Sequence, residues 1–347
     1  MQKKTKVFGG YNNCYYICIK NIVCHMKYIS ININDISTYR SELMGWSILW
    51  IMMLHFTFCQ IKPLGFIAQY GFAGVDIFVF VSGLGLFYSL DKDDNLIHYY
   101  RKRLLRIIPT YYILGFITNL LIIHDDIPTF LFTYSTIGFW IGLNYADWFI
   151  PSLLFLYFIA PLIKKIIDKK WFIFIIIIVV CIYLIVYYYT DKEEILDRSH
   201  FSLLHRIPAF VFGMISAFWL KNNAPSKYYF YILILGLPFF VYFYPFHHQI
   251  NNFKYYSLSF LLPLFVILFI LLSKYTKGIS QIIKKMGVAS LEIFLIQNIF
   301  FKLVLNGTTS TFPEWHDTIS FLMILFSAIM GIIAHWLIDK SGITKLI

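Results

Sequence analysis

The chain has 347 residues, of which 59% are hydrophobic, 20% aromatic and only 14% charged. Soluble domains carry about 25% charged residues, so this composition excludes an ordinary soluble protein. Apolar runs such as residues 171–189 have the length of roughly 20 residues that crosses a hydrocarbon core of about 30 Å. We therefore predict an integral membrane protein and interpret the net charge of +11 as a signal of membrane topology, without evidence for nucleic acid binding.

The predicted fold class is an all-α polytopic membrane protein, a bundle of about ten transmembrane helices that forms one domain over residues 44–338. The segment 127–143 is also apolar, but its Pro128 and several Thr and Ser residues favour a partly buried or re-entrant stretch. No connection is long enough for a separate soluble domain. The expected spans are residues 44–61, 71–90, 104–123, 148–163, 171–189, 207–220, 228–246, 256–273, 288–305 and 318–338.

Residues 1–43 form a polar and aromatic N-terminal segment that lacks the basic-then-apolar pattern of a cleaved signal peptide. Met26 reads as a more natural start, so the preceding residues are interpreted as a possible over-extension of the reading frame. Cys14, Cys18 and Cys24 lie here beside His25, but their spacing fits no structural zinc pattern. We predict no metal site.

The distribution of Lys and Arg predicts the orientation of the bundle. If residues 1–43 are cytoplasmic, most basic residues fall in connections on the same side, and residues 339–347 form a cytoplasmic tail. Positive charge accumulates on the cytoplasmic side of membrane proteins, so both termini are predicted to be inside. The other side carries Lys62, Lys192, Arg198, Arg206 and Lys254.

The first expected span, MGWSILWIMMLHFTFCQI, contains one histidine, His55. An ionisable side chain inside a membrane span is costly, which makes His55 a candidate functional residue. The alternative is a bundle histidine that is satisfied by a neighbouring side chain.

Asp76 lies about five residues into the second span and His55 about six residues from the outer end of the first, so both are expected roughly 8 to 9 Å below the outer face at 1.5 Å per residue. A carboxylate beside an imidazole fixes its tautomer and raises its basicity, as in a base that deprotonates a hydroxyl. The alternative, which does not exclude the first, is that Asp76 caps the second span near Gly74.

A basic cluster precedes the third span, in the sequence YYRKRLLR at residues 99–106. Arg103 and Arg106 are spaced i and i+3, which places them on one side of a helix, where two guanidinium groups can share a phosphate-bearing ligand. The alternative is that the cluster only determines topology.

These segments together resemble acyltransferase family 3, a family of membrane acyltransferases. The resemblance covers residues 44 to about 338 and implies an integral inner-membrane enzyme that transfers an acyl group, usually acetyl from cytoplasmic acetyl-CoA, to a hydroxyl of a surface or secreted glycan. By this resemblance His55 matches the family histidine, and Arg103 and Arg106 match its paired arginines. The similar segments are MGWSILWIMMLHF, GFAGVDIFVFVSGLGLFYS, YYRKRLLRIIPTYY, WFIPSLLFLYFIAPLI with Trp148 and Tyr157, HRIPAFVFGM, and SLEIFLIQ with Glu292 and Gln297.

The chain departs from the family pattern at three places. The family usually has an arginine eleven residues before the histidine, and here that position is Met44, with Arg40 one helical turn earlier as a possible replacement. Many members carry acidic residues where this chain has Leu153 and Leu154. The family often has histidine where this chain has Gln297, and an amide cannot exchange a proton near neutral pH.

We therefore expect a membrane O-acyltransferase in which His55, supported by Asp76, deprotonates an acceptor hydroxyl. Arg103, Arg106 and Arg40 are expected to bind the donor's phosphates. Acyl-CoA is the expected co-substrate, with no resident cofactor, and a polysaccharide or glycolipid is the expected acceptor. Two alternatives stay open: a catalytically inactive relative, suggested by Met44 and Gln297, and a glycan or lipid transporter, for which we see no internal repeat. The residues expected to line the site are Trp148, Tyr157, Glu292 and Gln297.

Overall fold

The computed structural model describes residues 34–56, 61–93, 95–141, 148–169, 171, 198–222, 261–305 and 316–342. Every regular element in these residues is a helix, which confirms the predicted all-α class for the described part of the chain. The helices are α2 (Asp35–Thr38), α3 (Arg40–His55), α4 (Lys62–Ala68), α5 (Ala73–Lys92), α6 (Leu96–Thr118), η1 (Asn119–Ile123), α7 (Ile127–Tyr134), α8 (Ile137–Trp140), α9 (Phe149–Asp168), α11 (Arg198–Lys221), α14 (Leu262–Tyr275), α15 (Lys277–Val288), α16 (Ser290–Leu305) and α17 (His316–Lys340).

Five of the described helical segments are long and apolar enough to cross a membrane: Ala73–Lys92, Leu96–Ile123, Phe149–Asp168, Ser202–Lys221 and His316–Lys340. Two further apolar helices, Leu262–Tyr275 and Ser290–Phe301, are shorter. The expected count of about ten spans is not confirmed. The spans expected at 171–189 and 228–246 lie outside the described residues, apart from Trp171.

The surface of the bundle is apolar where a soluble protein would be polar. Along α17, Phe321, Leu322 and Trp336 each expose more than half of their area, and η1 exposes Leu120 and Leu121 in the same way. Polar side chains such as Asp76, Glu292 and Gln297 are instead fully buried. Apolar exterior with buried polar groups is the pattern expected of helices that face lipid, so the chain is a membrane protein.

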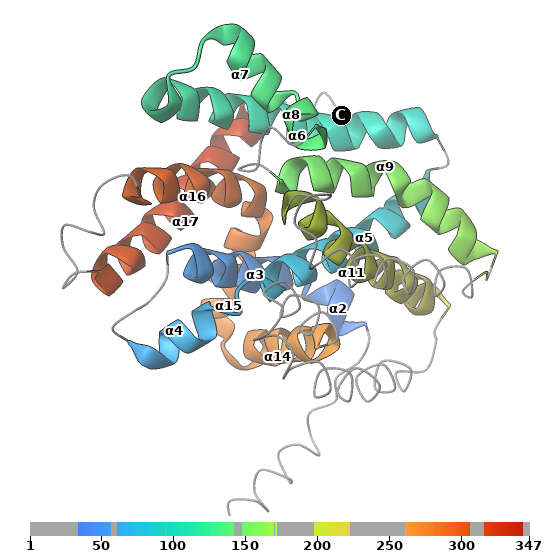
Figure 1. Ribbon diagram of the computed structural model, residues 1–347. Helices are drawn as coiled ribbons and strands as arrows, with labels where there is room; N and C mark the ends of the chain where they lie inside the picture. The colour runs from blue at the N-terminus through green and yellow to red at the C-terminus, as the bar shows by residue number, and fades with distance from the viewer. Residues whose placement is uncertain are drawn as a thin grey trace, which may run out of the picture.

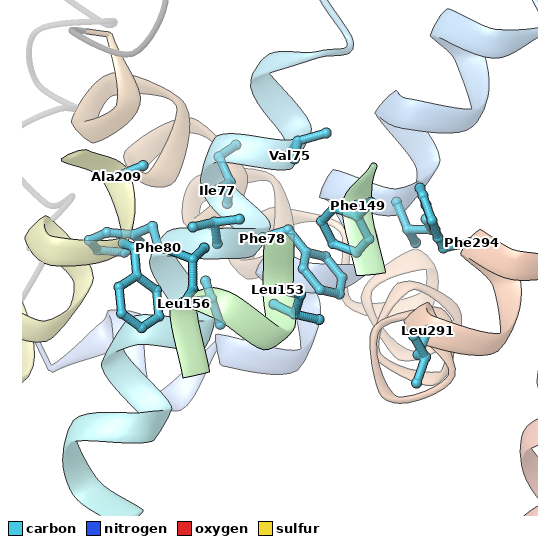
Figure 2. Close-up of a cluster of buried hydrophobic side chains, with 14 of the residues drawn as sticks. Val75, Ile77, Phe78, Phe80, Phe149, Leu153, Leu156, Ala209, Leu291 and Phe294 are labelled. Atoms are coloured by element: carbon cyan, nitrogen blue, oxygen red, sulfur yellow. The ribbon is translucent and has the colours of Figure 1, made fainter. Parts of the chain in front are cut away.

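Helix α3 lies in the middle of the bundle (Figure 1), where it packs against α5, α14, α15 and α16. A cluster of buried side chains joins α5, α9 and α16 next to it (Figure 2). In this cluster the ring of Phe149 lies 5.8 Å from that of Phe78 and 4.6 Å from that of Phe294. The aromatic contacts therefore fix the mutual positions of the three helices whose inner residues face the candidate site.

Two glycines allow α3 and α15 to approach closely. A Cβ added to Gly45 would lie 1.9 Å from the carbonyl oxygen of Ile283, and one added to Gly287 would lie 1.7 Å from that of Ser41. Only a residue without Cβ fits at such an approach.

The structure corrects several expected boundaries. Helix α3, which corresponds to the first expected span, begins at Arg40 and ends at His55. The expectation that His55 lies about six residues before the outer end of this helix is therefore wrong. Helix α6 begins at Leu96, so the basic cluster is itself helical. Residues expected to connect two spans form the amphipathic helix α15. The apolar segment after α6 is divided into α7 and α8 at Thr136, which has a positive φ of 69°.

The start of α6 is fixed by side chains in the connection from α5. The Asn95 side chain accepts hydrogen bonds from the backbone N–H groups of Ile97 and His98, as an N-cap does. The backbone N–H of Asn95 donates to Asp93, which also pairs with His98, and these two contacts lower the pKa of the Asp93 carboxyl. These contacts fix the start of α6 at Leu96.

Candidate active site

A polar cavity of about 230 Å³ lies between the beginnings of α3 and α16, the end of α15 and the middle parts of α5, α6 and α9. It is lined by three of the residues that the sequence predicted as donor ligands, Arg40, Arg103 and Arg106. Arg103 and Arg106 therefore do share one face of α6, as their spacing predicted. We call this side of the bundle the arginine end. The other lining residues are Ser41, Met44, Phe78, Ser82, Leu86, Ile107, Leu153, Tyr157, Gly287, Val288, Ser290 and Leu291.

Arg40 reaches this cavity from the first residue of α3 and rests on Gly85 of α5. A Cβ on Gly85 would lie 2.2 Å from a terminal nitrogen of Arg40, so the absence of a side chain there makes room for the guanidinium. Met44 lines the same cavity one turn later. Arg40 therefore brings a positive charge to the same cavity wall that Met44 lines.

Arg103 stands between this cavity and a second, apolar one. Its Cζ lies 5.8 Å from the centroid of the Tyr99 ring, and its buried Nε has no hydrogen-bond partner. No carboxylate of a described residue pairs with Arg103 or with Arg40. Two guanidinium groups without a counter-charge on one cavity wall favour an anionic ligand. The second cavity, of about 320 Å³, is lined by Tyr100, Arg103, Leu104, Leu154, Tyr157 and Phe158.

Arg106 differs from the other two arginines because it has a carboxylate partner. Its Nη1 lies 2.6 Å from Oε1 of Glu292 and its Nη2 lies 3.3 Å from Oε2, which is a two-pronged ion pair. Nδ1 of His335 in α17 lies 3.2 Å from the same Oε1 and 3.4 Å from Nη2 of Arg106. Glu292 has no exposed surface, so this cluster ties α6, α16 and α17 together inside the bundle.

His55 lies at the last residue of α3, at the opposite end from Arg40; we call this side the histidine end. Its ring is 5.4 Å from that of Phe301, and Gln297 is the polar side chain beside it. Nδ1 of His55 and both polar atoms of the Gln297 amide are buried without a hydrogen-bond partner among the described residues. Unsatisfied polar atoms of this kind are rare in a core and are frequent where a ligand supplies the missing partner.

The expected pairing of His55 with Asp76 is not formed. The Asp76 carboxylate lies 3.0 Å from Nη1 of Arg206, and both side chains are almost completely buried. Nη2 of Arg206 also donates to the carbonyl oxygen of Phe72, 3.5 Å away, and its guanidinium lies 5.9 Å from the Trp148 ring. A buried carboxylate needs a nearby cation, and Arg206 of α11 is that cation for Asp76. Residue spacing along α3 and α5 could not predict this partner, because it comes from another helix.

Two side chains near the start of α17 form hydrogen bonds with the backbone of Phe56 and of Ile61. Ser320 donates a hydrogen bond to the carbonyl oxygen of Phe56, and Oδ2 of Asp317 accepts one from the backbone N–H of Ile61, 2.7 Å away. Both side chains are buried. Asp317, Ser320 and His335 were not among the candidate residues predicted from the sequence. The rule that ionisable residues inside a span are functional candidates would have selected His335.

Residues 43–340 match the model of an acyltransferase domain, that of acyltransferase family 3. The chain belongs to this family. It is also 26% identical over 196 residues to a protein of Acidianus two-tailed virus named as an acetyltransferase, ORF330. That match covers 53% of this chain and 58% of the viral protein, so the chain spans little more than half of that relative. No solved structure matches the chain.

The match is to an acyltransferase domain, and the apolar exterior of the bundle is that of a membrane protein. Within this family fold, the structure brings Arg40, Arg103, Arg106 and Tyr157 to one cavity, and Glu292 to its edge through Arg106. Gln297 accompanies His55 at the other end of α3. Trp148 does not line the cavity and lies against Arg206 instead. The cysteines near His25 lie outside the described residues.

Proposed function

We propose that this acyltransferase transfers an acyl group, with acetyl as the simplest case, from acyl-CoA to a hydroxyl of a cell-surface or secreted polysaccharide. The observation that carries the donor assignment is the pair of arginines, Arg40 and Arg103, which face one cavity and have no carboxylate partner in the part of the chain that the structure describes. CoA carries several phosphate groups, which are the ligands that uncompensated guanidinium groups bind best. The name of the viral relative supports acetyl as the transferred group.

The spacing along α3 suits a donor that is long and extended. Arg40 and His55 are the first and last residues of α3, about 22 Å apart at 1.5 Å per residue. With the phosphates at the arginine end, the flexible arm of CoA would run along α3 and present its thioester at the histidine end. The acceptor hydroxyl would enter there from the opposite side of the membrane.

The chemistry proposed for His55 is general base catalysis. A ring nitrogen of His55 accepts the proton of the acceptor hydroxyl while its oxygen attacks the thioester carbonyl carbon. The tetrahedral intermediate collapses with cleavage of the C–S bond, and the imidazolium returns the proton to the leaving thiolate. The amide N–H₂ of Gln297 would donate to the oxyanion of that intermediate, which Gln can do although it cannot exchange a proton.

The proposed location is the cell membrane, with the arginine end in the cytoplasm, where acyl-CoA is found. The exposed Arg101 and Lys102 lie at this end, which fits the enrichment of basic residues on the cytoplasmic side. The orientation gives the enzyme a donor site on one side of the bilayer and an acceptor site on the other.

The test compares surface glycans of cells that produce the protein, cells that lack it and cells that produce His55→Ala. Mass spectrometry is expected to find ester-linked acyl groups only with the unaltered protein, and mild alkali should remove them. Calorimetry with purified protein and acetyl-CoA tests the donor separately. Identical glycans in all three strains would reject the acceptor class, and the absence of acetyl-CoA binding would reject the donor.

A further inference from the structure

The two arginines of the RKRLLR segment have different surroundings, although their spacing suggests equal roles. Both guanidinium groups of Arg103 and Arg106 reach the same cavity. Arg106 has its two terminal nitrogens on the two oxygens of Glu292. Arg103 contacts an aromatic ring and leaves its buried Nε unpaired.

The Glu292 carboxylate depends on Arg106. It has no exposed surface, and its described partners are Arg106 and His335. In the tautomer with a proton on Nδ1, His335 donates to Oε1, but a neutral imidazole does not neutralise a carboxylate. Removing the partner of a buried charge is strongly destabilising. If the Arg106 guanidinium moved to bind a phosphate, the buried Glu292 carboxylate would lose its counter-charge.

We propose that Arg106 is a positioning residue, clamped by Glu292 and His335, and that Arg103 is the arginine of this pair that contacts the donor's phosphates. The clamp holds α6 against α16 and α17 and so fixes the register at which Arg103 enters the cavity. His335 acts as the third member, since its contact with Glu292 orients the carboxylate toward Arg106. The assignment of Arg103 rests on the proposed acyl-CoA donor, whereas the clamp does not.

The experiment measures two quantities on purified full-length protein in nanodiscs: the midpoint of thermal unfolding without donor, and the Kd for acetyl-CoA. Arg103→Ala is expected to raise the Kd roughly tenfold or more, because a charged hydrogen-bond partner of the phosphates is lost, with little change in the midpoint. Arg106→Ala is expected to lower the midpoint. The double variant Arg106→Met with Glu292→Gln is expected to recover most of that loss, because it removes both charges together.

His335 is tested by the pair His335→Gln and His335→Ala, since only glutamine can still donate to Glu292. The glutamine variant should retain the midpoint better than the alanine variant. If Arg106→Ala does not fold, Arg106→Lys replaces it, because lysine keeps the charge opposite Glu292 but loses the two-pronged contact.

Two results would overturn the proposal. One is an Arg106–Glu292 double variant that is no more stable than Arg106→Ala, which would mean that the two side chains are not coupled. The other is a double variant that recovers the unfolding midpoint but whose acetyl-CoA affinity still falls as far as that of Arg103→Ala, which would make Arg106 a phosphate ligand. If the unaltered protein binds no acetyl-CoA, the proposed donor fails, while the unfolding midpoints still decide whether the clamp exists.

Discussion

At the scale of single residues, His55 is the proposed general base. His55→Ala is expected to lower the rate of acyl transfer by about 10²- to 10⁴-fold, the usual contribution of a general base. The control is His98→Ala, which removes an exposed histidine that pairs with Asp93 at the start of α6. The measurement is the initial rate with purified protein and a saturating donor. A His55→Ala enzyme that works at the original rate would remove His55 from the mechanism.

Variants of Arg40 test whether this residue replaces the family arginine that is missing at Met44, one helical turn later. A cation alone satisfies the positive-inside rule, but recognition of phosphate by a planar fork requires arginine. Arg40→Lys is therefore expected to insert normally and to raise the KM for acyl-CoA, and Arg40→Ala combined with Met44→Arg should recover part of the loss because both positions line the cavity. Full activity of Arg40→Lys would show that Arg40 serves topology alone.

The arginines that line the cavity could be predicted from the sequence because each lies within about one turn of a second lining residue on the same helix. Arg103 and Arg106 share a helix face through their spacing, and Arg40 and Met44 lie one turn apart. The partners of Asp76 and Arg106 were not predictable in this way, since Arg206, Glu292 and His335 come from helices far along the chain. The end of α3 at His55 was also missed, because the apolar run continues past it and hydropathy alone does not mark where a helix stops.

At the scale of helices, the contact between α3 and α15 sets the shape of the polar cavity that Arg40 and Arg103 line. Gly287 both lines that cavity and touches the backbone of Ser41, so Gly287→Ala must push α15 away from α3. Overpacking of this kind costs about 1 to 3 kcal/mol. We expect a lower unfolding midpoint together with weaker donor binding.

The matched control for this helix contact is Gly278→Ala in the first turn of the same helix. A Cβ at Gly278 meets no atom within 4 Å, so alanine should be neutral or slightly stabilising there. Equal effects of the two substitutions would show that the close approach of α15 is not what Gly287 provides. Helix α15 itself was not expected, because Lys277, Lys284 and Lys285 make this short segment between two apolar runs typical of a basic connection between spans.

At the scale of the whole molecule, the two ends of the bundle have opposite characters, and the proposed reaction needs them on opposite sides of the membrane. The arginine end collects Arg40, Arg103 and Arg106, whereas the histidine end holds His55 and Gln297. Helix α17 begins beside Phe56 and passes Arg106 before it ends, so residues near its end belong to the arginine end. The orientation of α17 therefore predicts on which side of the membrane residues 339–342 lie.

Single cysteines introduced into a cysteine-free variant test this arrangement. Lys62 is exposed at the histidine end, and Lys102 and Lys340 are exposed at the arginine end. If the arginine end is cytoplasmic, a membrane-impermeant thiol reagent added to intact cells should label Lys62→Cys and should reach Lys102→Cys and Lys340→Cys only after permeabilisation. The inverse labelling would place the arginines away from the cytoplasmic acyl-CoA and would require a different donor. Labelling of Lys102→Cys and Lys340→Cys from opposite sides would contradict the path of α17 itself.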